Sequence, residues 1–272
     1  MSKHSMQQTQ IQTQSLIQNW EQILRCKIFF YDTITSTSTV AKEMLKSGAI
    51  TPFFVIANKQ TAGYGQYGNV WDSTIVGNLY MSYATNNSNK SGNMSIYPQY
   101  IALNICSYLS EKFCIDPMVK WPNDIFIKKE KLGGILLESV KTEKTTSFVL
   151  GIGMNILNAP KLQHSQYEPI SIAELTNKMV NSNDIIFGIL ESISPATKNF
   201  QKLKINEFKN LWSKYDLLAD KRVTIESGNN KFCGIARGVG DLGELLVETD
   251  DGKMLQFYSG RSKIIFSETF IV

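Results

Sequence analysis

A chain of 272 residues that is 43% hydrophobic and 19% charged has the composition of a globular protein with ample apolar material for a core. Its formal net charge of +4 suits anionic ligands but is too small to indicate nucleic-acid binding. With two histidines, a histidine-rich metal site is excluded, and His164 is expected in a loop. Four cysteines without a C-x-x-C pair indicate buried free thiols.

The N-terminal segment is polar and rich in glutamine. Residues 1–19 lack the basic-then-apolar order of a signal peptide, and no apolar run approaches the ~20 residues that a membrane helix requires. We therefore expect residues 1–24 to be a loose tail or the start of a surface helix. We also expect a cytoplasmic protein without a membrane partner.

Helices and strands alternate in the next part of the chain. Hydroxyl residues precede the apolar-periodic segment 40–45, which predicts a helix that ends at Gly48. Residues 53–57 and 79–84 predict buried strands. Apolar residues at every fourth position predict an amphipathic helix over 97–113.

A meander of strands is expected over residues 119–156. Apolar runs at 125–127, 135–137 and 148–150 are separated by short polar turns, which favours antiparallel pairing. The region that follows is predicted to be helical, with a possible capping box at Ser171 and Glu174 and a helical stretch over 184–215 that breaks near Pro195.

The composition changes after Asp220. Short apolar segments alternate there with Gly, Asn and Asp turns, which predicts a small all-β domain. Its expected strands are 223–225, 232–235, 245–247 and 264–266. We therefore divide the chain into a tail (1–24), a larger domain (25–219) and a small β domain (220–272). The larger domain mixes helices with a mainly antiparallel sheet, so the fold class is α+β.

A glycine-rich loop at residues 63–68 matches G-x-G-x-x-G. A Rossmann site needs a helix directly after the glycines and an acidic residue about twenty positions further on. In this chain a strand is predicted in place of the helix, and Ser88 occupies the position of the acidic residue. The protein-kinase pattern extends through Val70, but no V-A-I-K, H-R-D or D-F-G follows. A plain connecting loop with an anchoring Trp71 is an alternative. Glycines nevertheless let backbone N–H groups approach a phosphate or carboxylate closely.

Two lysine motifs follow the loop. Lys120-Trp121-Pro122-Asn123-Asp124 places a cation and a carboxylate on one tight turn, and Gly133-Gly134 stand two residues after Lys131. A backbone without side chains beside a cation can admit an anionic ligand. The ordinary alternatives are an exposed hairpin lysine and a turn-forming aspartate.

These motifs, together with Ser36-Thr37, the Gln60–Trp71 loop and Gly151-Ile152-Gly153-Met154-Asn155, resemble those of biotin–protein ligases, in the family order. The family loop commonly reads Q-x-x-G-R-G-R-x-G-R-x-W. The resemblance implies a class II synthetase-like catalytic domain and a small C-terminal SH3-like β-barrel. It also implies adenylation of biotin by ATP, with Mg²⁺, and transfer of biotin to a lysine of a biotin carboxyl carrier protein or domain.

The resemblance assigns the site residues. The catalytic residues are Lys131, Lys120 and Asp124, and Asp124 is also the candidate magnesium contact and general base. The biotin site comprises Ser36, Thr37, Gln60, Gly63, Lys131, Gly133, Gly134, Ile135, Gly151 and Gly153. The ATP and adenylate site comprises Tyr64, Gly65, Gln66, Trp71, Lys120, Asn123, Lys131 and Asn155.

The chain departs from the family loop at Tyr64, Gln66 and Asn69, where arginines are usual. Asn69 beside Val70 and Trp71 resembles the eukaryotic form of the motif. At Tyr64 and Gln66 the loss of two guanidinium groups removes charge-assisted hydrogen bonds to a phosphate. Ser38 also replaces the asparagine that often follows Ser-Thr. Three other interpretations remain open: a lipoate or octanoate ligase of related fold, a biotin-responsive DNA-binding repressor, and a non-catalytic biotin-binding module. The short, weakly charged leader predicts no nucleic-acid partner. The protein is expected to be a monomer or a homodimer.

Overall fold

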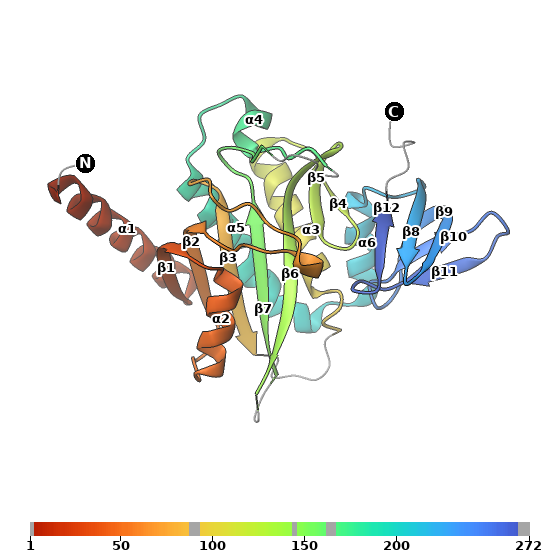
Figure 1. Cartoon of the computed structure of the whole chain (residues 1–272), viewed down its shortest axis with the longest axis horizontal. Coiled ribbons are helices and arrows are strands. Elements are labelled where there is room, and N and C mark those ends of the chain that lie inside the picture. Colours follow the sequence, from red (N-terminus) through yellow and green to blue (C-terminus); the bar gives the residue numbers. More distant parts are fainter. Residues whose placement is uncertain (1–2, 87–92, 143–145, 162–166, 266–272) are drawn as a thin grey trace.

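The computed structural model describes residues 3–86, 93–142, 146–161 and 167–265, and for residues 3–11 the backbone alone. The expectations for His164 and Phe266 lie outside the described residues. The molecule contains two β-sheets and the helices that pack around them. Helix α1 (Lys3–Leu24) and the second sheet lie at its opposite ends (Figure 1). None of the helices in these ranges is long and apolar enough to cross a membrane.

The larger sheet has seven strands in the order β1-β2-β3-β7-β6-β5-β4. The strands are β1 (Lys27–Ile34), β2 (Phe53–Gln60), β3 (Leu79–Asn86), β4 (Pro117–Lys120), β5 (Asp124–Ile127), β6 (Glu130–Lys141) and β7 (Thr146–Met154). Strands β1 and β2 pair in parallel, and every other neighbouring pair is antiparallel. The prediction of a mixed, mainly antiparallel sheet is therefore confirmed.

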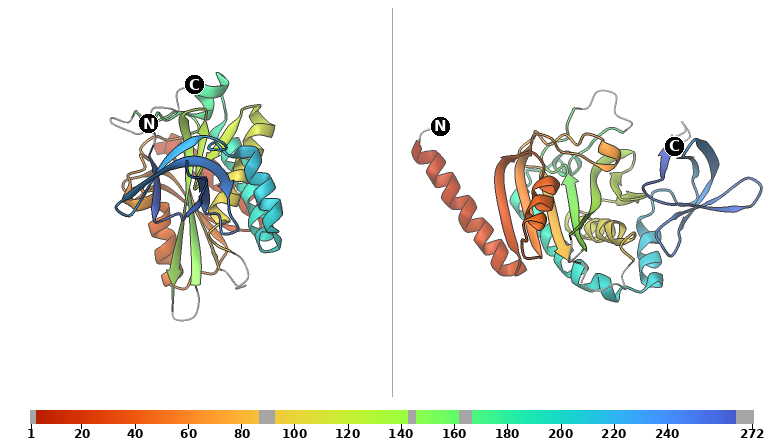
Figure 2. Two further views of the ribbon diagram at one scale, coloured as in Figure 1. Left: turned by 90° about the vertical axis from the view of Figure 1, so that its right-hand side faces the viewer. Right: turned by 60° about the horizontal axis from the view of Figure 1, so that its bottom comes forward.

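Helices cover both faces of this sheet (Figure 2). Helix α2 (Thr37–Lys46) packs on one face, and α3 (Tyr97–Phe113) and α5 (Ser182–Asn199) form the layer on the other. Helix α4 (Ile172–Thr176) lies beyond one end of the sheet, and α6 (Ile205–Tyr215) lies beside α3 and the second sheet. Strand β2 shows why two layers form, because alternate side chains point to opposite faces. Phe53 and Val55 join a small apolar cluster with Ala41 of α2, whereas Phe54 and Ile56 join the large core that includes α3 and α5.

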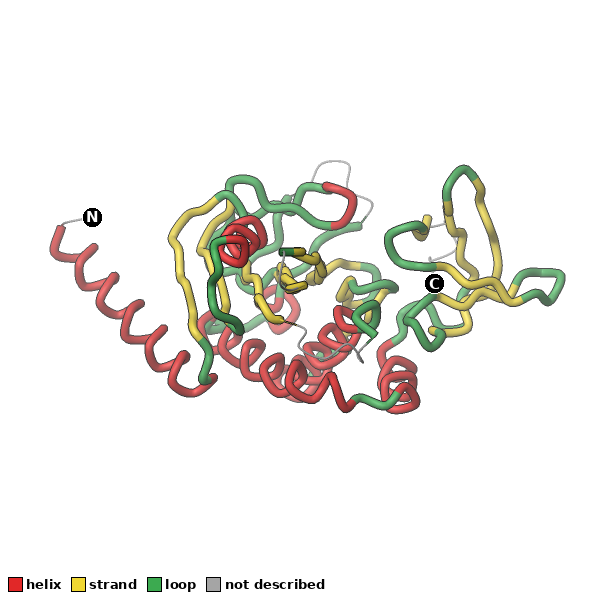
Figure 3. Tube along the Cα trace, turned by 90° about the horizontal axis from the view of Figure 1, so that it is seen from below, coloured by secondary structure: helices red, strands yellow, loops and turns green. Residues whose placement is uncertain are grey.

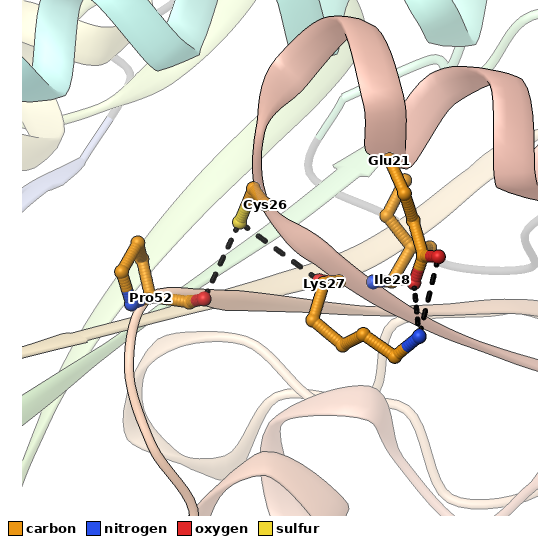
Figure 4. Close-up of polar contacts among 5 residues, drawn as sticks. All are labelled: Glu21, Cys26, Lys27, Ile28 and Pro52. Atoms are coloured by element: carbon orange, nitrogen blue, oxygen red, sulfur yellow. Dashed lines mark hydrogen bonds and ion pairs between the residues drawn. The ribbon is translucent and has the colours of Figure 1, made fainter.

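The junction of α1 and β1 is closed by polar contacts. The Glu21 carboxylate accepts from the Ile28 N–H at 2.8 Å and pairs with the Lys27 ammonium (Figure 4). Cys26 Sγ lies 3.4 Å from the Pro52 carbonyl oxygen, and burial raises the pKa of this thiol to about 11, which makes it an inert core group. Residues 3–24 thus form a helix that is held at its C-terminal end. Of the two expectations for this segment, a loose tail and the start of a surface helix, the structure shows the helix.

The second sheet is antiparallel, in the order β11-β10-β9-β8-β12. Its strands are β8 (Arg222–Ser227), β9 (Asn230–Val239), β10 (Leu245–Glu248), β11 (Met254–Phe257) and β12 (Ser262–Ile265). Figure 3 shows it as a group of strands beside the helical layer. The side chains of Trp121 and Gln99 both donate to the Gly243 carbonyl, at 2.9 and 2.7 Å, and so join the two sheets.

One expectation about the helices is wrong. Helix α5 does not break near Pro195 but runs through it to Asn199, and the interruption comes at residues 200–204. A proline inside a helix removes one backbone hydrogen bond. Ile193 and Ala196 on either side of Pro195 are buried, so packing against the core outweighs that loss.

Candidate active site

Strands β4, β5 and β6 bring the two lysine motifs to one end of the larger sheet. Lys120 ends β4 and pairs in register with Asp124, which starts β5. Asp124 in turn lies opposite Gly134 on β6, and the register shifts by one residue between Ile125 and Phe126. The tight turn and the irregular register together bring Lys131 beside Asp124, although seven positions separate them in the sequence.

Lys131 and Asp124 form an ion pair, with Nζ 2.8 Å from Oδ2. Each side chain keeps about a quarter of its surface exposed, at 24%. A Cβ on Gly134 would lie 2.8 Å from Asp124 Oδ1 and 3.7 Å from Lys131 Nζ, so the glycine leaves the room that the pair occupies. The ammonium is thereby held in one place and remains accessible to a ligand.

Lys120 is a second and more deeply buried cation. Only 6% of its surface is exposed, and its Nζ lies 4.8 Å from the centroid of the Tyr167 ring. Burial lowers the pKa of Lys120 to about 8; the Asp124 carboxylate raises it, and the charges of Lys131 and Lys263 lower it further. An incoming anion would therefore be favoured here, because it would offset the cost of burying this charge.

Glycines on β6 and β7 form a wall without side chains beside these lysines. A Cβ on Gly153 would come within 2.4 Å of Trp71 Nε1, and one on Gly151 would lie 2.7 Å from Ser38 Oγ. Gly133 and Gly153 approach each other so closely that a Cβ on the first would meet the carbonyl of the second at 2.8 Å. The glycines of both strands are thus needed for close approach of neighbouring groups.

Trp71 covers part of this glycine wall. The centroid of its ring lies 5.5 Å from Lys131 Nζ, within the range of a cation–π contact. Its indole Nε1 is buried and has no hydrogen-bond partner in the part of the chain that the structure describes. A buried N–H without a partner costs free energy, and a ligand oxygen at this position would satisfy it.

A buried polar network lies at the other end of the glycine wall. Gln60 accepts from the Thr37 N–H at 2.7 Å through Oε1 and donates to Ser73 Oγ at 2.8 Å through Nε2. Ser82 Oγ donates to Thr37 Oγ1 at 2.8 Å and lies 2.9 Å from Ser38 Oγ. Such a set of donors and acceptors suits a small polar head group at the end of an apolar ligand.

The motifs pointed to Thr37 and Gln60 but not to two members of this network. Ser73 stands in an irregular segment and Ser82 in the middle of the apolar strand β3, and a single serine in such settings gives no sequence signal. Ser36, another predicted biotin contact, is buried at the N-terminus of α2. Ile135 is buried on β6 beside the glycines.

Two predicted nucleotide contacts have structural partners. The side-chain amide of Asn123 donates to the Ile135 carbonyl, and that of Asn155 donates to the Ile170 carbonyl at 3.1 Å. Both side chains are buried. These bonds fix the turns that carry Asp124 and follow Gly153, so both residues shape the site whether or not they contact a ligand.

The glycine loop lies between the larger sheet and the second sheet. Tyr64 Oη is 2.8 Å from both Lys42 Nζ and Glu138 Oε2. Gln66 Nε2 donates to Ser259 Oγ at 3.5 Å, and Gly65 N–H donates to the Asn69 carbonyl within the loop at 2.8 Å. Tyr64 and Gln66, which replace two of the usual arginines, thus face neighbouring protein groups.

The described residues contain no cluster of three or more His, Cys, Asp and Glu side chains that could hold a metal ion. Asp124 can offer one carboxylate oxygen, although Lys131 already engages this group. Mg²⁺ is commonly bound by one or two carboxylates together with substrate phosphates. The donor set therefore fits a magnesium ion carried by a polyphosphate rather than a site built by the protein alone.

The fold and the site define a class of α+β protein in which two lysines, a carboxylate and a glycine wall form a site suited to an anionic ligand. A family model described as "Biotin/lipoate A/B protein ligase family" matches residues 30–155, and one described as "Biotin protein ligase C terminal domain" matches residues 219–261. The two matches extend over more than half of the chain. The protein belongs to the biotin/lipoate A/B protein ligase family.

Relatives and solved structures agree with this assignment. The bifunctional ligase/repressor BirA of Bacillus subtilis (strain 168) is 27% identical over 228 residues, which are 83% of this chain and 70% of the relative. A biotin–[acetyl-CoA-carboxylase] ligase of Mycobacterium tuberculosis is 26% identical over 229 residues, 80% of this chain and 82% of the relative. The biotin protein ligase from Aquifex aeolicus in complex with biotin and ATP has a TM-score of 0.77 at 25% identity, covering 89% of this chain and 99% of that one.

Proposed function

We propose that the protein is a biotin–protein ligase, which adenylates biotin with ATP and transfers it to a lysine of a biotin carboxyl carrier protein or domain. The observation that carries the proposal is the ion pair of Lys131 and Asp124, placed beside a glycine wall that leads to a buried polar network. A carboxylate and a phosphate can meet at the ammonium. The apolar body of biotin can lie along the wall with its polar head in the network.

The first step joins two anions, and the lysines offset their repulsion. The biotin carboxylate attacks the α-phosphate of ATP, a P–O bond forms, and pyrophosphate leaves with the electrons of the bond that breaks. In this proposal the carboxylate and the phosphate meet at Lys131, whose ammonium is held by Asp124 and would stabilise the charge that develops. Lys120 adds a second positive charge on the same side. Magnesium bound to the phosphates would neutralise the departing pyrophosphate.

The second step transfers biotin to the carrier. The ε-amine of the acceptor lysine attacks the carbonyl of the mixed anhydride, AMP leaves, and the amine gives up a proton. The amine must be neutral, against a usual pKa of about 10.4. Asp124 is the nearest carboxylate to Lys131 and is our candidate for the group that receives the proton. Holding the amine close to the carbonyl contributes independently of any base.

Biotin is favoured over lipoate or octanoate by two observations. Residues 219–261 match the C-terminal domain of biotin protein ligases. The second is the buried network of Thr37, Gln60 and Ser73, because a ureido head needs both donors and acceptors, whereas an alkyl chain needs neither.

Transfer of labelled biotin tests the proposal directly. The pure protein is incubated with ATP, Mg²⁺, labelled biotin and an isolated biotin carboxyl carrier domain, and label on the carrier is measured. Label should appear only with ATP present and should be absent when the acceptor lysine of the carrier is replaced by arginine. Labelling with lipoate or octanoate in place of biotin would favour the alternative, and no labelling by any acid would overturn the proposal.

A further inference from the structure

Tyr64 joins three parts of the molecule that are far apart in the sequence. Its hydroxyl lies 2.8 Å from Lys42 Nζ on α2 and 2.8 Å from Glu138 Oε2 on β6. Lys42 and Glu138 also pair directly, with Nζ 2.8 Å from Oε1. The Lys42 ammonium lies 5.3 Å from the centroid of the Tyr64 ring. Helix α2, the glycine loop and β6 therefore meet at one closed triangle of polar groups.

The hydroxyl serves both charges at once. It accepts a hydrogen bond from the ammonium and donates one to the carboxylate, and both are charge-assisted. The triangle is partly shielded from water, since about a quarter of each charged side chain is exposed. Burial lowers the pKa of Lys42, but the hydrogen bonds to Glu138 and Tyr64 outweigh it and raise the pKa above its usual value. With its donor and an acceptor site used, the hydroxyl is committed to protein partners.

The backbone of the loop connects this triangle to the ligand site. Tyr64 and Val70 face each other in an isolated antiparallel bridge, and Trp71 N–H donates to the Gly63 carbonyl at 3.0 Å. The two limbs of the loop thus form one small hairpin. One limb is anchored by the Tyr64 side chain, and the other carries Trp71 against Gly153 and within 5.5 Å of Lys131 Nζ.

We propose that Tyr64 is a positioning residue that fastens the glycine loop to the Lys42–Glu138 pair, holds Trp71 over the ligand site and thereby slows release of the adenylate. The part of this inference that concerns the adenylate rests on the proposed function. The tether itself does not, because it is a property of the ligand-free protein. Tyr64 thus replaces the arginine of the common loop with a protein contact instead of a ligand contact.

Tyr64→Phe tests the tether, and Tyr67→Phe is its matched control. Both changes remove one phenolic hydroxyl from the same loop, but Tyr67 is largely exposed and its hydroxyl lies 3.5 Å from its partner, the Ser262 carbonyl. Chymotrypsin cleaves after both tyrosine and phenylalanine, so each variant keeps its cleavage site. In the ligand-free protein, Tyr64→Phe should speed cleavage of the loop about tenfold, the effect of losing a hydrogen bond to a charged group. Tyr67→Phe should change it less than twofold.

Glu138→Gln provides the second arm. In a double-variant cycle, Tyr64→Phe should add little to the cleavage rate of Glu138→Gln, because the two changes break the same contact. The tether is overturned if Tyr64→Phe leaves cleavage unchanged, if Tyr67→Phe speeds it equally, or if the two effects simply add. Melting temperatures confirm that each variant is folded.

A separate experiment measures how tightly the protein holds the adenylate. Tyr64→Phe should raise the dissociation rate of biotinyl-AMP and the KM for biotin about tenfold, with kcat for ATP–pyrophosphate exchange within twofold of the parent. A fall in kcat at constant KM would overturn the positioning role. If the parent protein forms no adenylate, the proposed function fails, while the cleavage assay still decides whether the tether exists.

Discussion

Lys131 and Asp124 lie on neighbouring strands with the ammonium 2.8 Å from the carboxylate, and Gly134 leaves the space in which they meet. The pair fixes a cation that keeps about a quarter of its surface exposed, and the proposed reaction would bring its two anions together at this ammonium. Removing the cation should therefore affect the chemical step more than the fold.

Lys131→Ala should lower the rate of biotin-dependent ATP–pyrophosphate exchange by about 10²–10³, the usual effect of losing one preorganised charge contact. The circular dichroism spectrum should not change, because the substitution removes one partly exposed side chain and leaves the backbone pairing of β5 and β6 in place. Lys129→Ala, which removes an exposed lysine from the same turn, is the control. Near-normal exchange in a folded Lys131→Ala protein would rule out the role assigned to this residue.

Gly153→Ala tests the contact between Trp71 and the glycine wall. The new methyl group would lie 2.4 Å from Trp71 Nε1, so the indole must move, and the KM for biotin or ATP should rise at least tenfold. If Trp71 is the group that is displaced, Gly153→Ala should raise the KM much less in a Trp71→Ala background. An equal rise in KM in the two backgrounds would show that the methyl group obstructs something other than the indole.

Lys120 should be unfavourable for stability and favourable for binding. Burial lowers its pKa from 10.5 to about 8, so below pH 8 the folded protein holds a charged, desolvated lysine. Between pH 8 and 10.5 Lys120 is protonated in the unfolded chain but neutral in the folded protein, so its contribution to the free energy of unfolding increases as the pH rises. Lys120→Met should therefore stabilise the ligand-free protein at pH 7 by on the order of 3 kcal/mol, and the gain should shrink towards pH 10.

The same change should weaken ATP binding. The KM for ATP should rise in Lys120→Met, and in the parent it should rise as the pH passes about 8, where Lys120 loses its charge. Urea unfolding and initial rates across the pH range measure the two effects, with Lys129→Met as the surface control. A destabilised Lys120→Met protein at pH 7 would contradict the account of its burial.

Parts of this fold are predictable because their signals are local. The helix over 97–113 has the predicted bounds, and the capping box of Ser171 and Glu174 is present with both of its hydrogen bonds. Strand β1 escaped prediction because it lies at the edge of the sheet and its burial does not alternate. Strand β11 escaped it because it is short and mostly exposed.

In the candidate site, too, contacts between residues close in sequence could be predicted, whereas contacts between distant residues could not. Lys120, Asp124 and Lys131 lie together because a tight turn and one strand pairing connect them, and both are local in sequence. Lys42 and Glu138 are 96 positions apart, and their meeting at Tyr64 depends on how α2 packs on the sheet. Periodicity and motifs carry no information about such a contact, so only the structure reveals it.

Gln66→Arg tests whether the loop lacks charge. Gln66 offers only a neutral amide, which now faces Ser259 at 3.5 Å, where the common loop has a guanidinium group. A hydrogen bond to a charged group is worth roughly 1.5–3 kcal/mol, against about 1 for a neutral pair. The substitution should slow dissociation of biotinyl-AMP about tenfold in stopped-flow measurements. If release is not slowed, Lys120 or another cation already supplies the charge.

Biotin ligase activity is tested most directly by ATP–pyrophosphate exchange in the pure protein with biotin, lipoate or octanoate as the only carboxylic acid. Exchange reports formation of the acyl adenylate alone and needs no carrier protein. We expect rapid exchange with biotin, and exchange at the level of the acid-free blank with lipoate and octanoate. Exchange that is equally fast with lipoate, or absent with biotin, would contradict the proposed function.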